Sequence, residues 1–320
     1  MSIHINPEGE TTVLPVRFAD NLVRTGVIPD GSCIFHAILS SYSNKYIKLS
    51  KDEKYEYIKR LRSTLPDLIT RDIWMNLGHG EVSRLGFTEK LVELLSHTYD
   101  YISDKSDISE TDDEYAYLKP ILEYIDSNKV FCQFIANRIS LDDINTHIIG
   151  QYKHDRDVYF DAINFVKYVK KYFKNKYGKN LNEQDALKFN QLVSRLVDFF
   201  DIISKSAIDM AYSVCKKQLG DNQFWIGMEY IGFISEIFSV NIYFIDAKTM
   251  MPYVFGDEQM FPHKKSIILL WVDDSHFEIV GVIEDNTIRR TFNSEEPLIK
   301  MIHLYSINPK KAIKKYEVNK

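Results

Sequence analysis

The sequence predicts an α+β fold, with a small twisted β-sheet flanked by helices and enlarged by a large helical insertion. Apolar residues recur at helical spacing over residues 30–42. Three short runs rich in β-branched residues, at 240–246, 266–272 and 276–283, have the length and composition of strands. Residues 115–204 carry helical patterns without any sustained strand-like alternation. The fold is therefore expected to come from the two ends of the chain, with helices inserted between them.

Composition is that of a globular chain and excludes several classes of function. Of 320 residues, 45% are hydrophobic and 27% are charged, and the formal net charge is −5. That charge gives no global basic field, so we expect no nucleic-acid partner. We see no secretory signal and no uninterrupted apolar stretch of about 18 residues, so we expect no membrane partner. The abundance of Tyr, Ile, Lys and Asn suggests an AT-rich genome and a viral source.

The cysteines indicate a reducing compartment. There are three, Cys33, Cys132 and Cys215, an odd number without paired spacing. This pattern predicts neither a disulfide framework nor a zinc site, and we expect no metal and no cofactor. We place the chain in the cytoplasm, which would be the host cytoplasm for a viral protein, because reducing conditions keep a thiol usable there.

The first predicted element is the helix over residues 30–42. Asp30 is a suitable N-cap residue, and Gly31 permits a tight entry into the helix. Further helical patterns cover residues 51–65 and 88–99. The segments 77–80 and 85–87 that lie between them contain glycine and are expected to be loops.

The acidic stretch 103–114 suggests a domain boundary. Beyond the helical insertion, residues 223–238 predict a helix that leads into the first late strand, and residues 273–275 form a turn before the last strand. The resulting division of the chain has five parts: a lead-in at 1–19, a first core part at 20–100, an acidic connection and helical insertion at 101–204, a second core part at 205–285, and a C-terminal tail at 286–320.

Cys33 follows a turn and begins an apolar helix. Near the first turn of a helix, free backbone N–H groups and the positive end of the dipole favour the thiolate. The same amides could bind the oxyanion that forms when a thiolate attacks a carbonyl. Taken alone, the pattern also fits an ordinary capped helix with a small buried residue at its start.

His276 and Glu278 lie two residues apart in the last strand, so they share one face of it. Glu278 could then hydrogen-bond one imidazole nitrogen and leave the other for a thiol. Phe277 and Ile279 face the opposite way, into apolar packing. Taken alone, this pattern also fits a surface strand whose polar residues meet only water.

Three segments together resemble the OTU (ovarian tumour) family of cysteine deubiquitinases. Asp30-Gly31-Ser32-Cys33-Ile34-Phe35-His36-Ala37 is similar to the family's nucleophile motif. Phe224-Trp225-Ile226-Gly227, followed by the run 234–242, is similar to its Trp-Gly segment and the strand after it. Ser275-His276-Phe277-Glu278 resembles its final His-aromatic strand. The long separation of the first and last segments implies a viral-type member with a helical insertion, and the resemblance does not extend to the middle of the chain.

The resemblance implies that Cys33 is the nucleophile and His276 the general base. Glu278 is the favoured third residue on strand geometry, while Asp30 is the acid instead, the residue that holds the oxyanion loop, or a structural N-cap. Gly31 and Ser32 would form the oxyanion turn together with the Cys33 amide. Ser32 departs from the asparagine usual in the family, and His36 is expected to be a residue of the helix surface.

The implied activity is thiol-dependent hydrolysis of the isopeptide bond after the ubiquitin C-terminal glycine. The expected partners are ubiquitin or polyubiquitin chains. Three alternatives stay open: an inactive ubiquitin-binding module, a protease for another ubiquitin-like modifier, and a scaffold in which the helical insertion is the working part.

Overall fold

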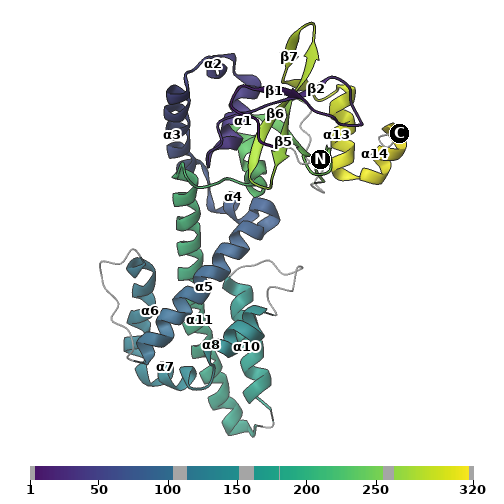
Figure 1. Ribbon diagram of the computed structural model, residues 1–320. Coiled ribbons are helices and arrows are strands. Elements are labelled where there is room, and N and C mark those ends of the chain that lie inside the picture. Colours follow the sequence, from purple (N-terminus) through teal and green to yellow (C-terminus); the bar gives the residue numbers. More distant parts are fainter. Residues whose placement is uncertain (1–3, 104–113, 151–161, 180, 255–262, 317–320) are drawn as a thin grey trace. The chain divides into compact units, whose positions relative to one another are not determined.

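The computed structural model describes residues 4–103, 114–150, 162–179, 181–254 and 263–316 (Figure 1). Its contacts divide the chain into two compact units. The first, here the sheet unit, comprises residues 1–69 and 218–320, and the second, the helical unit, comprises residues 70–217. The sequence placed the insertion at 101–204, whereas the contacts also group the helices between 70 and 100 with it.

The sheet unit contains one mixed sheet with the strand order β1-β2-β6-β5-β3-β4. β3 and β5 run parallel, and the other pairs along this order are antiparallel. β7 extends β6, and β8 extends β5. The three predicted late strands are confirmed as β3, β5 and β6. The bounds are β1 Thr11–Val13, β2 Leu22–Thr25, β3 Val240–Asp246, β4 Met251–Pro252, β5 Lys265–Val272, β6 His276–Glu284, β7 Thr287–Arg289 and β8 Phe292–Asn293.

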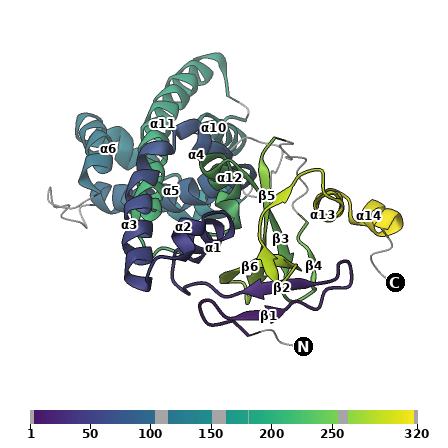
Figure 2. The ribbon, with the colours of Figure 1, turned by 90° about the horizontal axis from the view of Figure 1, so that it is seen from above.

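Helices cover both faces of this sheet (Figure 2). α1 lies against β5 and β6 on one face. On the other face, α13 packs Ile299 and Ile302 onto Ile268 and Val280 of the strands. The helices of the unit are α1 Cys33–Tyr42, α2 Asn44–Ile47, α3 Lys51–Leu68, the short 3-10 helix η3 Met228–Tyr230, α12 Ile231–Phe238, α13 Pro297–Ile307 and α14 Pro309–Tyr316.

Two expectations for this unit are corrected at helix starts. The helix predicted over 223–238 begins only at 228, because the carbonyl of Phe224 is used by a buried side chain of α3. α1 begins at Cys33, and Ser32 rather than Asp30 occupies its N-cap position, without a side-chain cap bond. Asp30 instead accepts the Ser32 amide at 2.8 Å, so it shapes the turn before the helix.

The described residues of the helical unit form helices around their own apolar core. The predicted helical character of residues 115–204 is confirmed where the structure describes them; the acidic stretch 104–113 lies outside the described residues. The elements are α4 Arg71–Asn76, η1 Leu77–Gly80, α5 Glu81–Ile102, α6 Tyr115–Ser127, α7 Lys129–Ala136, α8 Leu141–Asp143, the π-helix η2 Ile144–Ile149, α10 Ala162–Tyr177 and α11 Glu183–Gly220, the last of which ends in the sheet unit.

The loop predicted at 85–87 is wrong, because these residues lie inside α5. Phe87 and Leu91 are both buried, one helical turn apart, and extend the apolar stripe through the glycine. At Gly86 an added Cβ would lie 3.5 Å from the Cβ of Ala211, which is ordinary van der Waals contact, so an alanine would also fit there. None of the helices described here is both long enough and apolar enough to cross a bilayer.

Candidate active site

The first and last of the three motif segments meet at the start of β6. Cys33 is the first residue of α1, and its thiol donates to the carbonyl of Ser275 at 4.0 Å. The amide of Phe277 also interacts with the sulfur. The sulfur therefore contacts the backbone of the residues on either side of His276, although more than 200 residues of sequence separate them.

The Cys33 thiol is buried, with 1% of the residue exposed. Burial raises its pKa from 9.0 to about 11; the Phe277 amide acts in the opposite direction, and the charge of Asp30 adds to the rise. The sequence-based expectation that the helix start favours the thiolate is thus wrong for this state of the protein. Desolvation of the charged form outweighs the nearby amides, so the resting cysteine is a neutral thiol.

His276 is the first residue of β6 and is 3% exposed. Burial lowers the pKa of its imidazole from 6.5 to about 4, while the nearby charge of Asp30 raises it and that of His36 lowers it further. Its Nε2 is buried and has no hydrogen-bond partner. The ring is therefore neutral at pH 7 and not hydrogen-bonded to the Cys33 sulfur, and Nε2 is free to bind a proton.

Glu278 is fully buried, but its carboxylate is held by residues other than His276. Oε1 accepts the backbone amide of Asn6 at 2.6 Å, and Oε2 lies 3.3 Å from Nη1 of Arg24 in β2, a charge contact in which neither atom makes a hydrogen bond. Burial raises the pKa of this carboxyl, against the effects of Asn6 and Arg24. The predicted hydrogen bond from Glu278 to the His276 ring is absent, and its role as third residue stays a prediction.

Asp30 lies three residues before Cys33 and is bound through both oxygens. Oδ1 accepts the Ser32 amide, and Oδ2 lies 3.1 Å from Nε2 of His36. The prediction that His36 is a surface residue is wrong, since it is 1% exposed and its Nδ1 lies 2.6 Å from the hydroxyl of Tyr46. One signal could have revealed this: His36 lies between Phe35 and Ala37 in a stretch, residues 33–39, that contains no charged side chain and so predicts a largely buried helix.

The turn at residues 30–33, here the nucleophile turn, is closely packed against the loop 221–224. An added Cβ on Gly31 would lie 2.5 Å from the carbonyl oxygen of Gln223, so the glycine is required by space. The Ser32 hydroxyl donates to the carbonyl of Asn222 at 3.3 Å. The turn is thus closed by the protein's own loop, and Ser32 faces that loop.

Arg62, in the middle of α3, holds the loop and the turn together, and sequence reasoning missed it. It is fully buried and donates to the carbonyls of Leu219 at 2.6 Å and Gln218 at 2.8 Å, at the end of α11. It also reaches the carbonyls of Asp221 and Phe224 and, at 3.2 Å, the Ser32 hydroxyl. Burial lowers its pKa to about 10, so it stays charged at neutral pH. The negative end of a helix dipole compensates this buried cation.

The middle motif segment supports the start of β6 from the face covered by α1. Trp225 stacks on Phe277 with ring centroids 6.1 Å apart and planes at 6°. Phe277 also packs on Phe244 of β3 and is fully buried, as the strand pattern predicted. All three segments that carry the resemblance therefore contact one another around the first residues of β6.

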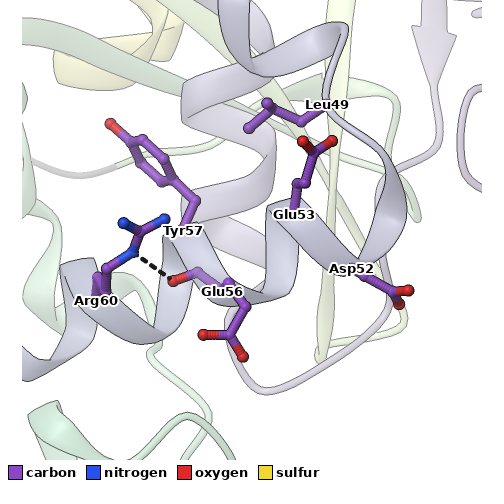
Figure 3. Close-up of a pocket in the computed structure, with 6 residues that line it drawn as sticks. All are labelled: Leu49, Asp52, Glu53, Glu56, Tyr57 and Arg60. Atoms are coloured by element: carbon purple, nitrogen blue, oxygen red, sulfur yellow. Dashed lines mark hydrogen bonds between the residues drawn. The ribbon is translucent and has the colours of Figure 1, made fainter.

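Two other features lie away from these residues. A surface hollow on α3 is lined by Leu49, Asp52, Glu53, Glu56, Tyr57 and Arg60 (Figure 3), none of which contacts the nucleophile turn. In the helical unit, ligating atoms of Glu93, His97 and Glu114 lie within 4.8 Å of one another, a spacing at which a metal could be held. Lys90 already pairs with Glu93 at 2.7 Å, and the three side chains are partly exposed.

Comparisons with known proteins give little beyond this geometry. No family model and no curated protein matches the chain. Among solved structures, an OTU domain in complex with ubiquitin is similar over 39% of this chain and 67% of that chain, with 19% identity and a TM-score of 0.24. A similarity this weak carries no argument about the site, which depends on the contacts described above.

The raised pKa of Cys33 predicts slow alkylation of the isolated protein. At pH 7.5, iodoacetamide should modify Cys33 at least about 100-fold more slowly than an unfolded peptide of the same sequence, because the thiolate is rare and the sulfur is buried. Mass spectrometry of the Cys33 peptide between pH 7 and 10 measures this, and the rate should rise throughout that range. A rate that is already maximal at pH 7.5 would show a low-pKa thiolate and contradict the prediction.

Replacement of Arg62 should destabilise the sheet unit. Arg62→Met removes the cation and leaves several buried carbonyls without donors, each worth about 1–3 kcal/mol, so we expect a loss of at least about 3 kcal/mol. Arg60→Met is the matched control, since Arg60 is an exposed residue of the same helix that donates to the Glu56 carbonyl, and it should change stability by less than about 0.5 kcal/mol. Equal losses in urea melts of the two variants would refute the assigned role of Arg62.

Proposed function

We propose that the sheet unit is a cysteine hydrolase of the OTU type that cleaves the isopeptide bond after the C-terminal glycine of ubiquitin. One observation carries the proposal. The sulfur of Cys33, at the start of α1, contacts the backbone on both sides of His276, whose buried Nε2 has no partner. A thiol held against the backbone of a histidine that has a free ring nitrogen brings together the two groups that nucleophilic catalysis with a general base requires.

In the proposed reaction the Cys33 thiol gives its proton to Nε2 of His276, and the sulfur attacks the carbonyl carbon of the ubiquitin C-terminal glycine. The amide of Cys33, which at rest donates to the carbonyl of Asp30 at 3.1 Å, donates to the oxyanion once substrate has opened the turn. The C–N bond then breaks as His276 returns the proton to the leaving lysine amine. A water that gives its proton to His276 hydrolyses the thioester and releases the ubiquitin carboxylate and the free thiol.

The described state is a closed resting state. While both groups are buried, the pKa of Cys33 is about 11 and that of His276 is about 4. With these values the thiol does not transfer its proton to the imidazole to any measurable extent. Catalysis therefore requires substrate to open the turn and rehydrate or pair these groups, which raises the imidazole pKa and lowers the thiol pKa. Entry of an extended ubiquitin tail between the turn and β6 is the step that we assign to this activation.

The closed site also favours a second candidate, a ubiquitin-binding module without turnover. In such a module Cys33 and His276 would stay buried and unbonded to each other, as they are in this structure. The two candidates differ in one observable, which is whether a ubiquitin C-terminus ever reaches the sulfur.

A ubiquitin with a C-terminal electrophile distinguishes them. Wild type should form one covalent adduct at Cys33, Cys33→Ala should form none, and His276→Ala should label at least about 100-fold more slowly because the base is lost. Cys132→Ala is the matched control, a buried cysteine of the helical unit, and should label like wild type. Intact-mass measurement over time reports all four.

Each alternative predicts its own pattern in this assay. Labelling that survives in Cys33→Ala removes Cys33 from the nucleophile role. Affinity for ubiquitin without any adduct supports the binding module. An adduct with another ubiquitin-like modifier carrying the same electrophile, but not with ubiquitin, moves the substrate to that modifier.

A further inference from the structure

Two carboxylates and one imidazole converge in the helical unit, away from the candidate active site. Glu93 and His97 lie one helical turn apart on α5, and Glu114 directly precedes α6. One ligating atom of each lies within 4.8 Å of the other two. Nε2 of His97 and Oε2 of Glu114 are 3.6 Å apart, although they belong to different segments of the chain. The fold thus gathers three side chains of the kinds that bind metals.

The backbone directs these side chains towards one another. Residues four apart on a helix project from the same side, so Glu93 and His97 can reach a common ion. Glu114 is the N-cap residue of α6, but within the described residues its side chain makes no cap bond to that helix. Its carboxyl group instead hydrogen-bonds that of Glu93. The position of Glu114 is therefore explained by the cluster and not by the capping of α6.

The distances suit a tetrahedral ion. Zinc bonds of about 2.0–2.1 Å to nitrogen and oxygen place neighbouring ligand atoms about 3.3 Å apart. The 3.6 Å between His97 and Glu114 is close to that spacing. Any pair at the 4.8 Å limit would have to close by about 1.5 Å. Side-chain rotation can supply this, since the side chains of Glu93, His97 and Glu114 are 25%, 42% and 36% exposed.

The charges around the cluster favour a divalent cation. Two carboxyl groups that hydrogen-bond each other must share a proton, and a metal ion can take the place of that proton. Lys90 lies 2.7 Å from Oε2 of Glu93 and 3.2 Å from Oε1 of Glu89. With Glu114, three carboxylates thus lie around one ammonium group, which leaves negative charge in excess.

The donor atoms select the kind of metal. Mg²⁺ and Ca²⁺ prefer oxygen ligands alone, whereas an imidazole together with carboxylates suits Zn²⁺. Three protein ligands leave the fourth tetrahedral position to water. The cysteine pattern, from which the sequence predicted no metal, does not bear on a ligand set that contains no cysteine.

We propose that Glu93, His97 and Glu114 bind a zinc ion, with water as the fourth ligand, and that the ion fastens the start of α6 to α5. The site belongs to the helical unit, so the proposal is independent of the proposed function of the sheet unit. The alternative is an ordinary surface cluster of ion pairs, in which Lys90 and His97 are the cations that the two glutamates require.

Calorimetric titration of the metal-stripped full chain with ZnCl₂ tests the proposal. Cys33→Ala serves as the parent protein, so that the thiol near His276 cannot bind the metal. We expect one zinc per chain, and an affinity at least about tenfold lower in His97→Ala and in Glu114→Gln. Co²⁺ in place of Zn²⁺ should give a visible spectrum without a thiolate charge-transfer band, because no cysteine is a ligand.

Two exposed residues of the helical unit give matched controls. His147→Ala removes another histidine, and Glu123→Gln another glutamate of α6, and both should bind zinc like the parent. Zinc should also raise the melting temperature of the parent but not that of His97→Ala. Equal zinc affinity in all variants would overturn the proposal, as would an equal loss in the controls or tighter binding of Ca²⁺ or Mg²⁺ than of Zn²⁺.

Lys90 offers a test in the opposite direction. Its ammonium group competes with a metal ion for Glu93, so Lys90→Gln should bind zinc about tenfold more tightly. An ion-pair cluster without a metal site predicts no zinc binding to the parent and none to this variant. Weaker zinc binding in Lys90→Gln than in the parent would show that the ion does not use Glu93, and would overturn this ligand set.

Discussion

The buried guanidinium of Arg62 is the constraint on which the geometry of the sheet unit's site depends. A cation without exposed surface must be surrounded by acceptors, and here these are carbonyls at the end of α11 and in the loop 221–224. Once those carbonyls converge on Arg62, the loop lies against Gly31 and Ser32. This packing on Gly31 and Ser32 restricts the conformation of the turn, and the turn in turn places Cys33 at the start of β6.

The same close packing explains why the resting site is neutral. The burial of Cys33 and of His276 removes the water that would stabilise a thiolate and an imidazolium. The burial that orders Cys33 and His276 in this state therefore also lowers their reactivity. A site of this kind gains selectivity, since only a ligand that opens the turn can restore the charged pair, and small electrophiles meet an inert thiol.

Local signals in the sequence predicted the elements but not their partners. Helical and strand periodicity gave the helix after Cys33 and the alternation around Phe277, because each depends on neighbouring residues. Arg62 and His36 were missed because their acceptors are set by tertiary packing. The start of the helix over 223–238 was misplaced for the same reason: the carbonyl of Phe224 is bound by a residue 162 positions away.

The case of Glu278 shows how a shared strand face differs from a contact. Period-two alternation correctly put His276 and Glu278 on one face of β6, but it does not predict which residues of the neighbouring strand lie close to them. β2 pairs with β6 and brings Arg24 opposite Val280, two residues along β6 from Glu278, so Arg24 and Glu278 share one face of the sheet. A buried carboxylate takes the partner that best offsets its desolvation, and a guanidinium with a backbone amide does so better than a neutral imidazole. Asp30, which the sequence left open as acid, loop-holding residue or cap, is not the N-cap of α1; its oxygens instead bind the Ser32 amide and approach His36.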